Sequence, residues 1–467
     1  MSDIDRDQAA RDALRLIGPD PANWVPDMAG IDHNVAIIGG GQTGCALAFA
    51  LRRAGIGKVT VIEAAPAPDQ AGIWLTAARM NLLRTPKSLV GPEVGISALG
   101  FQAWYEARHG QAAYAAIDRI PRVVWAAYLR WYREFLAIPV RYGTKLEKIE
   151  PADGKFKLYL NNGIQIFEYT RKIILATGFY GMGGMSIPAV LTDGLQASRL
   201  AHTDQHIDFA ALRGKTVVVV GAAASAIDAA GVALENGAAA AHLLARRDQI
   251  AALPVTRTRM FPGAYDNYHQ LSDALRWRLA RRFRDAGSTP TVDAIERAVA
   301  FAIFHLHLGA PLEDARMAGE RVVVRAGGKE IACDFVIAAT GYFADPNARP
   351  ELASVAGDIM LWRDRVNAAD DPYLGAHPYL GAGHEYLPRD RSSAPWLRDI
   401  HVQNPSGFVS FGLPIGDVPS MRRDIPTIVA AISRDLFAAD ARLHETRMFG
   451  DVPPDFPAEL YAKSVRG

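Results

Sequence analysis

The hydrophobic pattern of the chain contains one arrangement twice: a short apolar run, a turn of small residues and a longer apolar stretch. The runs at 35–38 and 217–220 are rich in β-branched residues, which is typical of parallel strands buried on both faces. The stretches that follow, at 45–55 and 228–238, have the apolar content of helices that pack on such strands. The pattern therefore predicts two copies of one β-α-β unit.

The turn of the first unit keeps all three glycines of a dinucleotide-binding loop. Gly39 permits the tight turn, Gly41 lets the backbone approach a pyrophosphate, and Gly44 lets the helix pack closely on the strand. The next strand ends at Glu63, near the distance at which a carboxylate accepts the ribose hydroxyls. We expect this unit to bind FAD permanently; the alternative is an ordinary buried strand–helix pair.

The turn of the second unit has alanines where the first has glycines. Gly221 keeps the first position, whereas Ala223 and Ala226 replace the second and third. A methyl group at these positions holds a pyrophosphate farther away or more loosely, which suits a coenzyme that must leave. We expect Gly221, Ala223, Ser225 and Ala226 to contact an exchanging nicotinamide coenzyme.

The end of the second strand distinguishes NADPH from NADH. The position that corresponds to Glu63 is Ala245, followed by Arg246 and Arg247. No carboxylate is present to repel a 2′-phosphate, and two guanidinium groups are available to bind one. The sequence therefore predicts NADPH at the second site. Alternatively, the two arginines are solvated surface charges.

Two further apolar strands, within 172–179 and 335–342, both end in Ala-Thr-Gly and return to the nucleotide of their own unit. In the second, Thr340 and Gly341 are candidate coenzyme-binding residues. The predicted fold class is α/β, with two Rossmann-like dinucleotide-binding domains, the second inserted into the first, and a helical insertion. The predicted boundaries are 1–196 and 345–467 for the FAD-binding domain and 197–344 for the NADPH-binding domain.

The segments between these units predict three more structures. Residues 121–137 read as a helix with Pro121 in its first turn, and 145–169 as a β-meander. The Arg- and aromatic-rich insertion at about 255–310 is expected to form a helical lid. It ends in a predicted helical run with His305 and His307, which would point to different sides of the helix, so we expect no metal site.

Composition excludes several classes of function. The net charge is +1 and opposite charges are interspersed, so neither nucleic acid nor an anionic membrane is expected as a partner. No apolar run reaches the roughly 18 residues of a membrane span, and the first residues lack a secretory signal core. Only Cys45 and Cys333 are present, which suggests a reducing compartment. We expect a cytoplasmic enzyme; the sequence does not predict its oligomeric state.

A bound FAD beside an exchanging NADPH implies hydride transfer from the nicotinamide to the flavin. The chain has no redox cysteine pair and no iron–sulfur or haem motif to accept the electrons. The remaining acceptors are dioxygen, a diffusible small molecule or a partner protein. With dioxygen, a flavin hydroperoxide would transfer one oxygen atom to a substrate if water is excluded.

The order of motifs resembles the class B flavin-dependent monooxygenases, which include flavin-containing monooxygenases, Baeyer–Villiger enzymes and ornithine and lysine N-hydroxylases. These motifs are GGGQTG, GIW at 72–74, G-x-A-x-S-A with trailing arginines, and ATGY. The resemblance places Gly72 and Trp74 near the flavin and equates His202-Thr203 with a family histidine–hydroxyl pair. Gln196, Ser198 and His206 depart from the fingerprint of the Baeyer–Villiger and sulfide-oxidising branches.

Two segments resemble the N-hydroxylases in particular. By resemblance, Asn81 would lie beside the flavin, Lys87 would grip a substrate carboxylate, and Asp417 would face the ribityl or pyrophosphate region. Asn404, Gly412 and Ser420 would lie near the nicotinamide and the flavin. The family's aspartate after the lysine is Ser88 here, which departs from the pattern of amino-acid substrates.

Arg84 and Lys87 add cationic groups to a stretch expected to line the cleft, which favours an anionic or carbonyl-rich substrate. The alternative is two surface charges on a loop. The candidate catalytic residues are Asn81, Arg84, Lys87 and Asn404. We therefore expect an NADPH-dependent FAD monooxygenase acting on a small polar substrate and dioxygen, with urate as one candidate. Its rivals are a flavin-dependent reductase or dehydrogenase and a non-catalytic NADPH-binding module.

Overall fold

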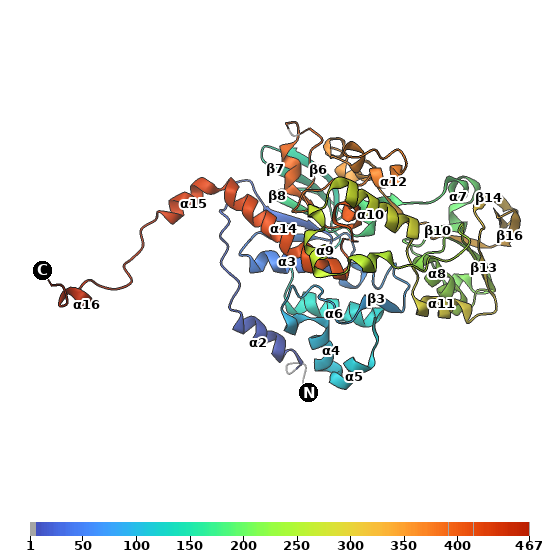
Figure 1. The fold of residues 1–467 in the computed structure, drawn as a ribbon, viewed down its shortest axis with the longest axis horizontal. Helices are drawn as coiled ribbons and strands as arrows, with labels where there is room; N and C mark the ends of the chain where they lie inside the picture. Colours follow the sequence, from blue (N-terminus) through green and yellow to red (C-terminus); the bar gives the residue numbers. More distant parts are fainter. Residues whose placement is uncertain (1–5, 391, 414, 467) are drawn as a thin grey trace.

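The computed structural model describes residues 6–390, 392–413 and 415–466, which form two sheet-containing domains (Figure 1). Each domain is built on a mainly parallel sheet with the predicted glycine turn at the end of its central strand. The predicted fold class is confirmed. In the first sheet the strand order is β5 (Val140–Arg141), β2 (Val59–Ile62), β1 (His33–Ile38), β8 (Gln165–Leu175), β7 (Lys155–Asn161) and β6 (Lys145–Ala152), with β19 (Ile400–Val402) also pairing with β8.

The second sheet has the strand order typical of a nucleotide-binding domain, with its central strand flanked by parallel neighbours. A three-stranded antiparallel sheet covers one of its faces. The order is β10 (Leu200–His202), β17 (Phe335–Ala338), β11 (Thr216–Val220), β12 (Ala240–Leu244) and β13 (Phe304–His307), and the covering strands are β14 (Leu312–Ala318), β15 (Arg321–Ala326) and β16 (Lys329–Cys333).

The chain crosses between the domains twice, at one place. Strand β9 (Gly183–Met185) pairs antiparallel with β18 (Tyr342–Ala344), so the outgoing and returning segments run side by side. Leu191 of α7 (Ala189–Gly194) already lies in the core of the second domain, although the boundary predicted from the sequence starts that domain at residue 197. We propose that the boundary lies at the β9–β18 pair, because buried contacts assign α7 to the second domain.

Apolar helices cover one face of the first sheet, as the hydrophobic pattern requires. Helix α3 (Gln42–Arg53) follows the glycine turn and is buried over most of its length, between the sheet and helices α6 (Arg122–Phe135) and α14 (Val418–Ala439). The predicted helix after Pro121 and the β-meander β6–β7–β8 are both observed. The helices on this face are α3 (Gln42–Arg53), α4 (Phe101–His109), α5 (Gln111–Ala116), α6 (Arg122–Phe135) and α14 (Val418–Ala439), with α2 (Gln8–Leu16) beside them.

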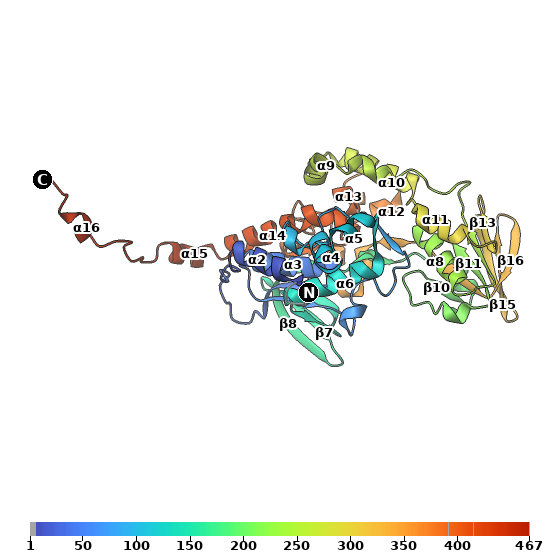
Figure 2. The same ribbon diagram turned by 90° about the horizontal axis from the view of Figure 1, so that it is seen from below.

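The insertion reaches from the second domain across the first (Figure 2). Its helices α9 (Pro262–Asn267) and α10 (Asp273–Ala286) pack on α14 and on α13 (Phe408–Phe411), whereas α11 (Val292–Val299) packs on α8 (Ala224–Glu235). The buried Arg259 and Arg276 donate to the carbonyl oxygens of Gly412 and Ser410 at 2.7 and 3.3 Å. The insertion is therefore anchored to the first domain by buried hydrogen bonds.

The predicted helix at the end of the insertion is wrong. His305 and His307 lie on the edge strand β13 and not on a helix, because residues 304–307 pair with β12. Alternate residues of a strand share a face, so both imidazoles lie next to His242, whose Nδ1 is 3.0 Å from Nε2 of His307. Burial and the two neighbouring histidines lower the pKa of His242 to about 4. Within the described ranges, no His, Cys, Asp and Glu side chains are grouped to hold a metal ion.

After α14 the chain leaves the body of the molecule. Helices α15 (Ala441–Met448) and α16 (Glu459–Ala462) lie on an arm that projects away from both domains in both views (Figures 1 and 2). His444 packs against Trp24 and Phe437, whereas residues 445–466 are exposed. Across the described residues, every helix is too short or too polar to cross a membrane.

Candidate cofactor and active site

The first glycine turn has the geometry of a phosphate-binding loop. Gly39 has φ +110°, and a Cβ there would lie 2.3 Å from the carbonyl oxygen of Ala176. A Cβ on Gly44 would lie 1.9 Å from the carbonyl oxygen of Gly39, so close helix packing requires glycine there. Gly41 instead is the N-cap of α3, and a Cβ there would lie 3.8 Å from the Cα of Gly72, which is an ordinary contact.

Glu63 lies where a ribose ligand is expected. Its Oε2 accepts a hydrogen bond from the amide of Gly40 at 2.7 Å, and its Oε1 accepts one from Ala65 at 2.8 Å. The carboxylate is therefore held at the edge of the glycine turn. Tyr142 lies close to Glu63 and Cys45, and its buried hydroxyl has no partner among the described residues.

Gln42, the first residue of α3, links three segments around the turn. Its Oε1 accepts from the indole Nε1 of Trp74 at 3.2 Å and from that of Trp125 at 3.1 Å. Its Nε2 donates to the carbonyl oxygen of Gly416 at 3.0 Å. Trp74 is thereby held next to the glycine turn, and the backbone just before Asp417 is brought against the start of α3.

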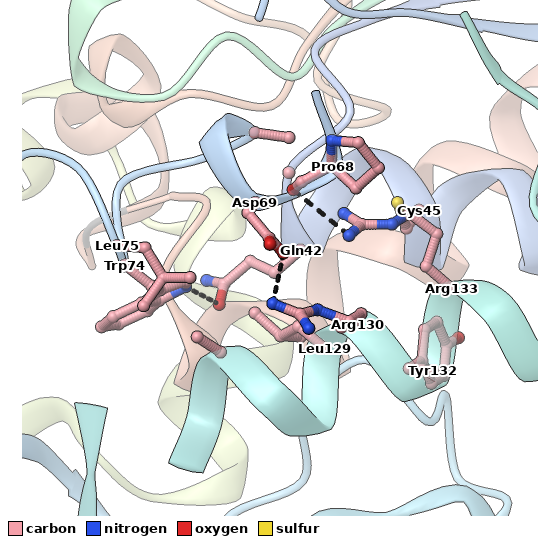
Figure 3. A pocket seen from close by; sticks show the side chains of 13 residues that line it. Gln42, Cys45, Pro68, Asp69, Trp74, Leu75, Leu129, Arg130, Tyr132 and Arg133 are labelled. Atoms are coloured by element: carbon pink, nitrogen blue, oxygen red, sulfur yellow. Dashed lines mark hydrogen bonds and ion pairs between the residues drawn. The ribbon is translucent and has the colours of Figure 1, made fainter. Parts of the chain in front are cut away.

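A pocket that opens to solvent lies beside the glycine turn (Figure 3). Three parts of the first domain form its walls: the start of α3, the loop 68–75 and the last turns of α6. The lining residues are Gly41, Gln42, Cys45, Pro68, Asp69, Ala71, Trp74, Leu75, Ala126, Leu129, Arg130, Tyr132 and Arg133. The glycine cradle, the carboxylate of Glu63 and the unpartnered Tyr142 hydroxyl fit the adenosine diphosphate part of FAD.

The ends of β8 and β19 bring two polar side chains together. Asn404, fully buried after β19, donates from Nδ2 to Oγ1 of Thr177 at 3.2 Å, and its Oδ1 accepts from the amide of Ser406. Both residues lie at the carboxyl ends of parallel strands, where α/β sheets bind ligands. The catalytic role predicted for Asn404 is not tested, but its position suits contact with a flavin.

Asp417 caps the N-terminus of α14, where its Oδ1 accepts from the amide of Ser420 at 3.1 Å. Burial raises the pKa of Asp417 to about 7. Ser420 also accepts from the amide of Gly416 at 3.1 Å through its hydroxyl. The loop 416–420 is therefore fixed against the start of α3, as the predicted contact of Asp417 with the cofactor requires.

The second turn repeats the geometry of the first. Gly221 has φ +126°, and a Cβ there would lie 2.3 Å from the carbonyl oxygen of Ala339. Ala223 is the N-cap of α8, Ser225 is exposed in its first turn, and Ala226 is buried against the sheet. The predicted coenzyme-binding positions therefore line the N-terminus of one helix.

The loop after β17 lies beside this turn. Thr340 donates through its hydroxyl to the carbonyl oxygen of Ser186, and the carbonyl oxygen of Gly341 accepts a hydrogen bond from Nε2 of His202 at 2.9 Å. His202 is buried, which lowers its pKa, and its neighbour Thr203 accepts a hydrogen bond from Arg79 of the first domain. This loop therefore joins the two crossing segments to the interface between the domains.

Arg246 and Arg247 lie in different environments. Arg247 donates to carbonyl oxygens at the C-terminal end of α10, with the shortest contact 2.6 Å to that of Asp285. Arg246 is exposed and makes no hydrogen bond or ion pair with any residue that the structure describes. The geometry therefore leaves Arg246 as the phosphate-binding candidate, whereas Arg247 attaches the end of α10 to the end of β12.

The ammonium group of Lys87 is fully hydrogen-bonded within the first domain. Its ammonium donates to the carbonyl oxygens of Tyr114, Ala115 and Ile117 at 2.7, 3.3 and 2.5 Å, and it lies 4.5 Å from the ring centroid of Tyr114. The substrate-binding role predicted for Lys87 is not tested; in this arrangement all three donors of the ammonium are used at the end of α5.

Arg84 lies near α8 of the second domain, and Asn81 lies on the same segment of the chain. Asn81 precedes β3 (Leu82–Pro86), which pairs with β4 (Arg119–Pro121), and its side chain is exposed. Burial raises the pKa of Asp228 on α8 to about 6, an effect that the positive charges of Arg84 and Arg297 oppose. Arg84 therefore faces the second domain, as a residue of the cleft should; its catalytic role is not tested.

Sequence reasoning missed the residues that join the domains. Arg79 donates to the carbonyl oxygen of Gln205 at 3.0 Å, and Arg297 donates to that of Arg79 at 2.9 Å while pairing with Glu235. Tyr142 was also missed. No motif marks these positions, because each contact joins residues far apart in the chain.

Known proteins share both the sequence and the fold. Residues 36–260 match the family described as pyridine nucleotide-disulphide oxidoreductase. An FAD-dependent urate hydroxylase from Xanthomonas campestris pv. campestris is 41% identical over 417 residues, which cover 88% of each chain. Two solved structures share the fold at 18% identity: ornithine hydroxylase from Pseudomonas aeruginosa, with a TM-score of 0.68 over 87% of this chain and 100% of that one, and L-lysine 6-monooxygenase from Pseudomonas syringae, with 0.65 over 86% and 99%.

The disulphide chemistry in the matched family's description finds no counterpart here. Cys45 and Cys333 are both buried and unpaired, lie in different domains, and have pKa values that burial raises to about 12. Identity of 41% over 88% of both chains instead groups the protein with FAD-dependent urate hydroxylase. The chain belongs to the family of FAD-dependent urate hydroxylase, and it shares its fold with the ornithine and lysine hydroxylases.

Proposed function

We propose that this flavin monooxygenase hydroxylates urate, with FAD as its resident cofactor and NADPH as the reductant. The observation that carries the proposal is the 41% identity to FAD-dependent urate hydroxylase over 88% of both chains. Urate is a carbonyl-rich anion at neutral pH, and Arg84 contributes positive charge to the interface between the domains.

FAD would be held by the glycine turn at 39–44, by Glu63 at the ribose and by the loop 416–420. When bound, it supplies the transfer of reducing equivalents from NADPH to dioxygen and of one oxygen atom to the substrate. The protein's own residues would position the cofactor and the substrate and exclude water from them. Gln42 holds Trp74 at the turn, Asn404 and Thr177 lie at the strand ends, and the anchored insertion covers α13 and α14.

The test is to incubate purified protein with NADPH and urate and to follow NADPH, dioxygen and urate together. We expect one NADPH and one dioxygen consumed per urate, with one oxygen atom gained in the product mass and little peroxide. L-Ornithine and L-lysine serve as control substrates, and they should not stimulate NADPH oxidation.

Other outcomes select other functions. Peroxide formed in step with NADPH oxidation, with urate unchanged, would indicate a reductase or oxidase activity without oxygen insertion. Protein that purifies without flavin and does not take up added FAD would indicate a binding module. Oxygen insertion into a different small molecule would keep the monooxygenase and reject urate.

A further inference from the structure

The loop 66–75 forms a strap over the pocket beside the first glycine turn (Figure 3). Three contacts hold it: Asp69 pairs with Arg130, Pro68 accepts from Arg133, and Trp74 donates to Gln42. Its Ile73 and Leu75 are 38% and 43% exposed, so the strap has apolar side chains that the protein itself does not cover. The strap is therefore tied down at both ends, and apolar side chains on either side of Trp74 are partly exposed.

The two arginines of α6 that contact the strap differ in charge balance. Arg130 forms an ion pair with Asp69, which compensates its charge. Arg133 donates from Nη2 to the carbonyl oxygen of Pro68 at 3.2 Å and pairs with no carboxylate in the part of the chain that the structure describes. A guanidinium has five N–H donors, so Arg133 brings an uncompensated positive charge and further donors to the pocket.

Tyr142 adds an unsatisfied group next to Arg133, beside the residues that line the pocket. Its buried hydroxyl lacks a partner among the described residues, its ring lies 5.7 Å from the Arg133 guanidinium, and it neighbours Glu63. A buried hydroxyl without a hydrogen bond is unfavourable. A ligand with a phosphate near Arg133 and a polar group near Tyr142 would satisfy both, and the N-terminus of α3 favours the same negative charge.

We propose that Arg133 binds the pyrophosphate of FAD, that Tyr142 binds its adenosine moiety, and that the strap 66–75 closes over both. This inference rests on the family assignment and not on urate as substrate. It assigns two residues outside the glycine motif to the cofactor, from a helix and a strand end that sequence motifs do not mark.

The test measures FAD binding to flavin-free protein, without NADPH or urate, by quenching of flavin fluorescence. For Arg133→Met we expect the Kd of FAD to rise about 10- to 100-fold, which corresponds to the free energy lost with one charged hydrogen bond. For Tyr142→Phe we expect a rise of about 2- to 10-fold. Arg316→Met, which removes an equal charge on β14, is the matched control and should leave the Kd unchanged.

Riboflavin, which lacks both phosphates and the adenosine, separates direct contact from distortion of the pocket. If Arg133 contacts the pyrophosphate, its replacement weakens FAD and leaves riboflavin binding unchanged. Equal losses for both ligands, or an FAD affinity equal to that of the unaltered protein in both variants, would overturn the proposal. Because urate turnover is not measured, a failed urate assay leaves this test intact.

Discussion

At the residue scale, Lys87 shows how nearby acceptors decide the role of a charge. Its three contacts to carbonyl oxygens at the end of α5 tie β3 to that helix. We predict that Lys87→Met lowers the free energy of unfolding by about 1 to 3 kcal/mol and leaves the KM for urate unchanged. Urea unfolding and steady-state kinetics measure the two effects, with the exposed Lys145→Met on β6 as control. A raised KM with unaltered stability would support the substrate-binding role instead.

Asp417 should make stability depend on pH. Its pKa is raised from the ordinary 3.8 to about 7 by burial, so the folded state keeps a proton that the unfolded state loses first. Stability is therefore lost as pH rises from about 4 to 7, and the loss is complete above the folded pKa. Asp417→Asn keeps an acceptor for the amide of Ser420 and removes the titration.

We predict that the stability difference between Asp417→Asn and the unaltered protein grows between pH 4 and pH 7, by at most about 4 kcal/mol. Urea unfolding of flavin-free protein at a series of pH values measures it. A difference that stays constant with pH would show that Asp417 is ionised in the folded protein throughout this range.

At the scale of elements, two neighbouring arginines after β12 provide an internal comparison. Arg246 has no partner among the described residues, whereas Arg247 is bound to the end of α10. We predict that Arg246→Ala raises the KM for NADPH about tenfold or more and leaves that for NADH unchanged. Arg247→Ala should instead make the end of α10 more sensitive to proteolysis. Equal effects of Arg246→Ala on both coenzymes would contradict the phosphate contact.

The contact between the insertion and α13 depends on one glycine. Gly412 has φ +78°, and a Cβ there would lie 2.2 Å from the ring of Tyr268. We predict that Gly412→Ala lowers the free energy of unfolding by about 2 to 4 kcal/mol, through overpacking and backbone strain. The double variant Gly412→Ala/Tyr268→Ala should recover part of this loss, which a double-mutant cycle measures.

Gly154 is the matched control for backbone strain, because it has φ +75° in a surface turn with no atom within 4 Å of the added Cβ. Gly154→Ala should therefore lower stability by only about 1 to 2 kcal/mol. If Gly412→Ala has no larger effect, the insertion is not seated on α13 as the structure shows.

At the scale of the whole molecule, the two domains touch through polar contacts and the covering insertion, whereas the C-terminal arm contacts the first domain only near its start, at His444. Residues 449–466 are exposed and the arm projects from the body (Figure 1). We predict that a chain ending at 450 retains its flavin and unfolds within about 2 °C of the full chain. Calorimetry and the flavin-to-protein ratio measure this. A larger loss would show that the arm docks on the folded protein.

The sequence determined the fold class, the family and the chemistry. The spacing of Gly39, Gly41 and Gly44 and the apolar runs before them act locally, through turn geometry and burial, so they can be read from a short stretch. What His307, Arg247 and Lys87 contact could not be read in this way. Their partners are distant in the chain, and only the tertiary structure decides which strand pairs, which carbonyl lies within reach and which charge stays exposed.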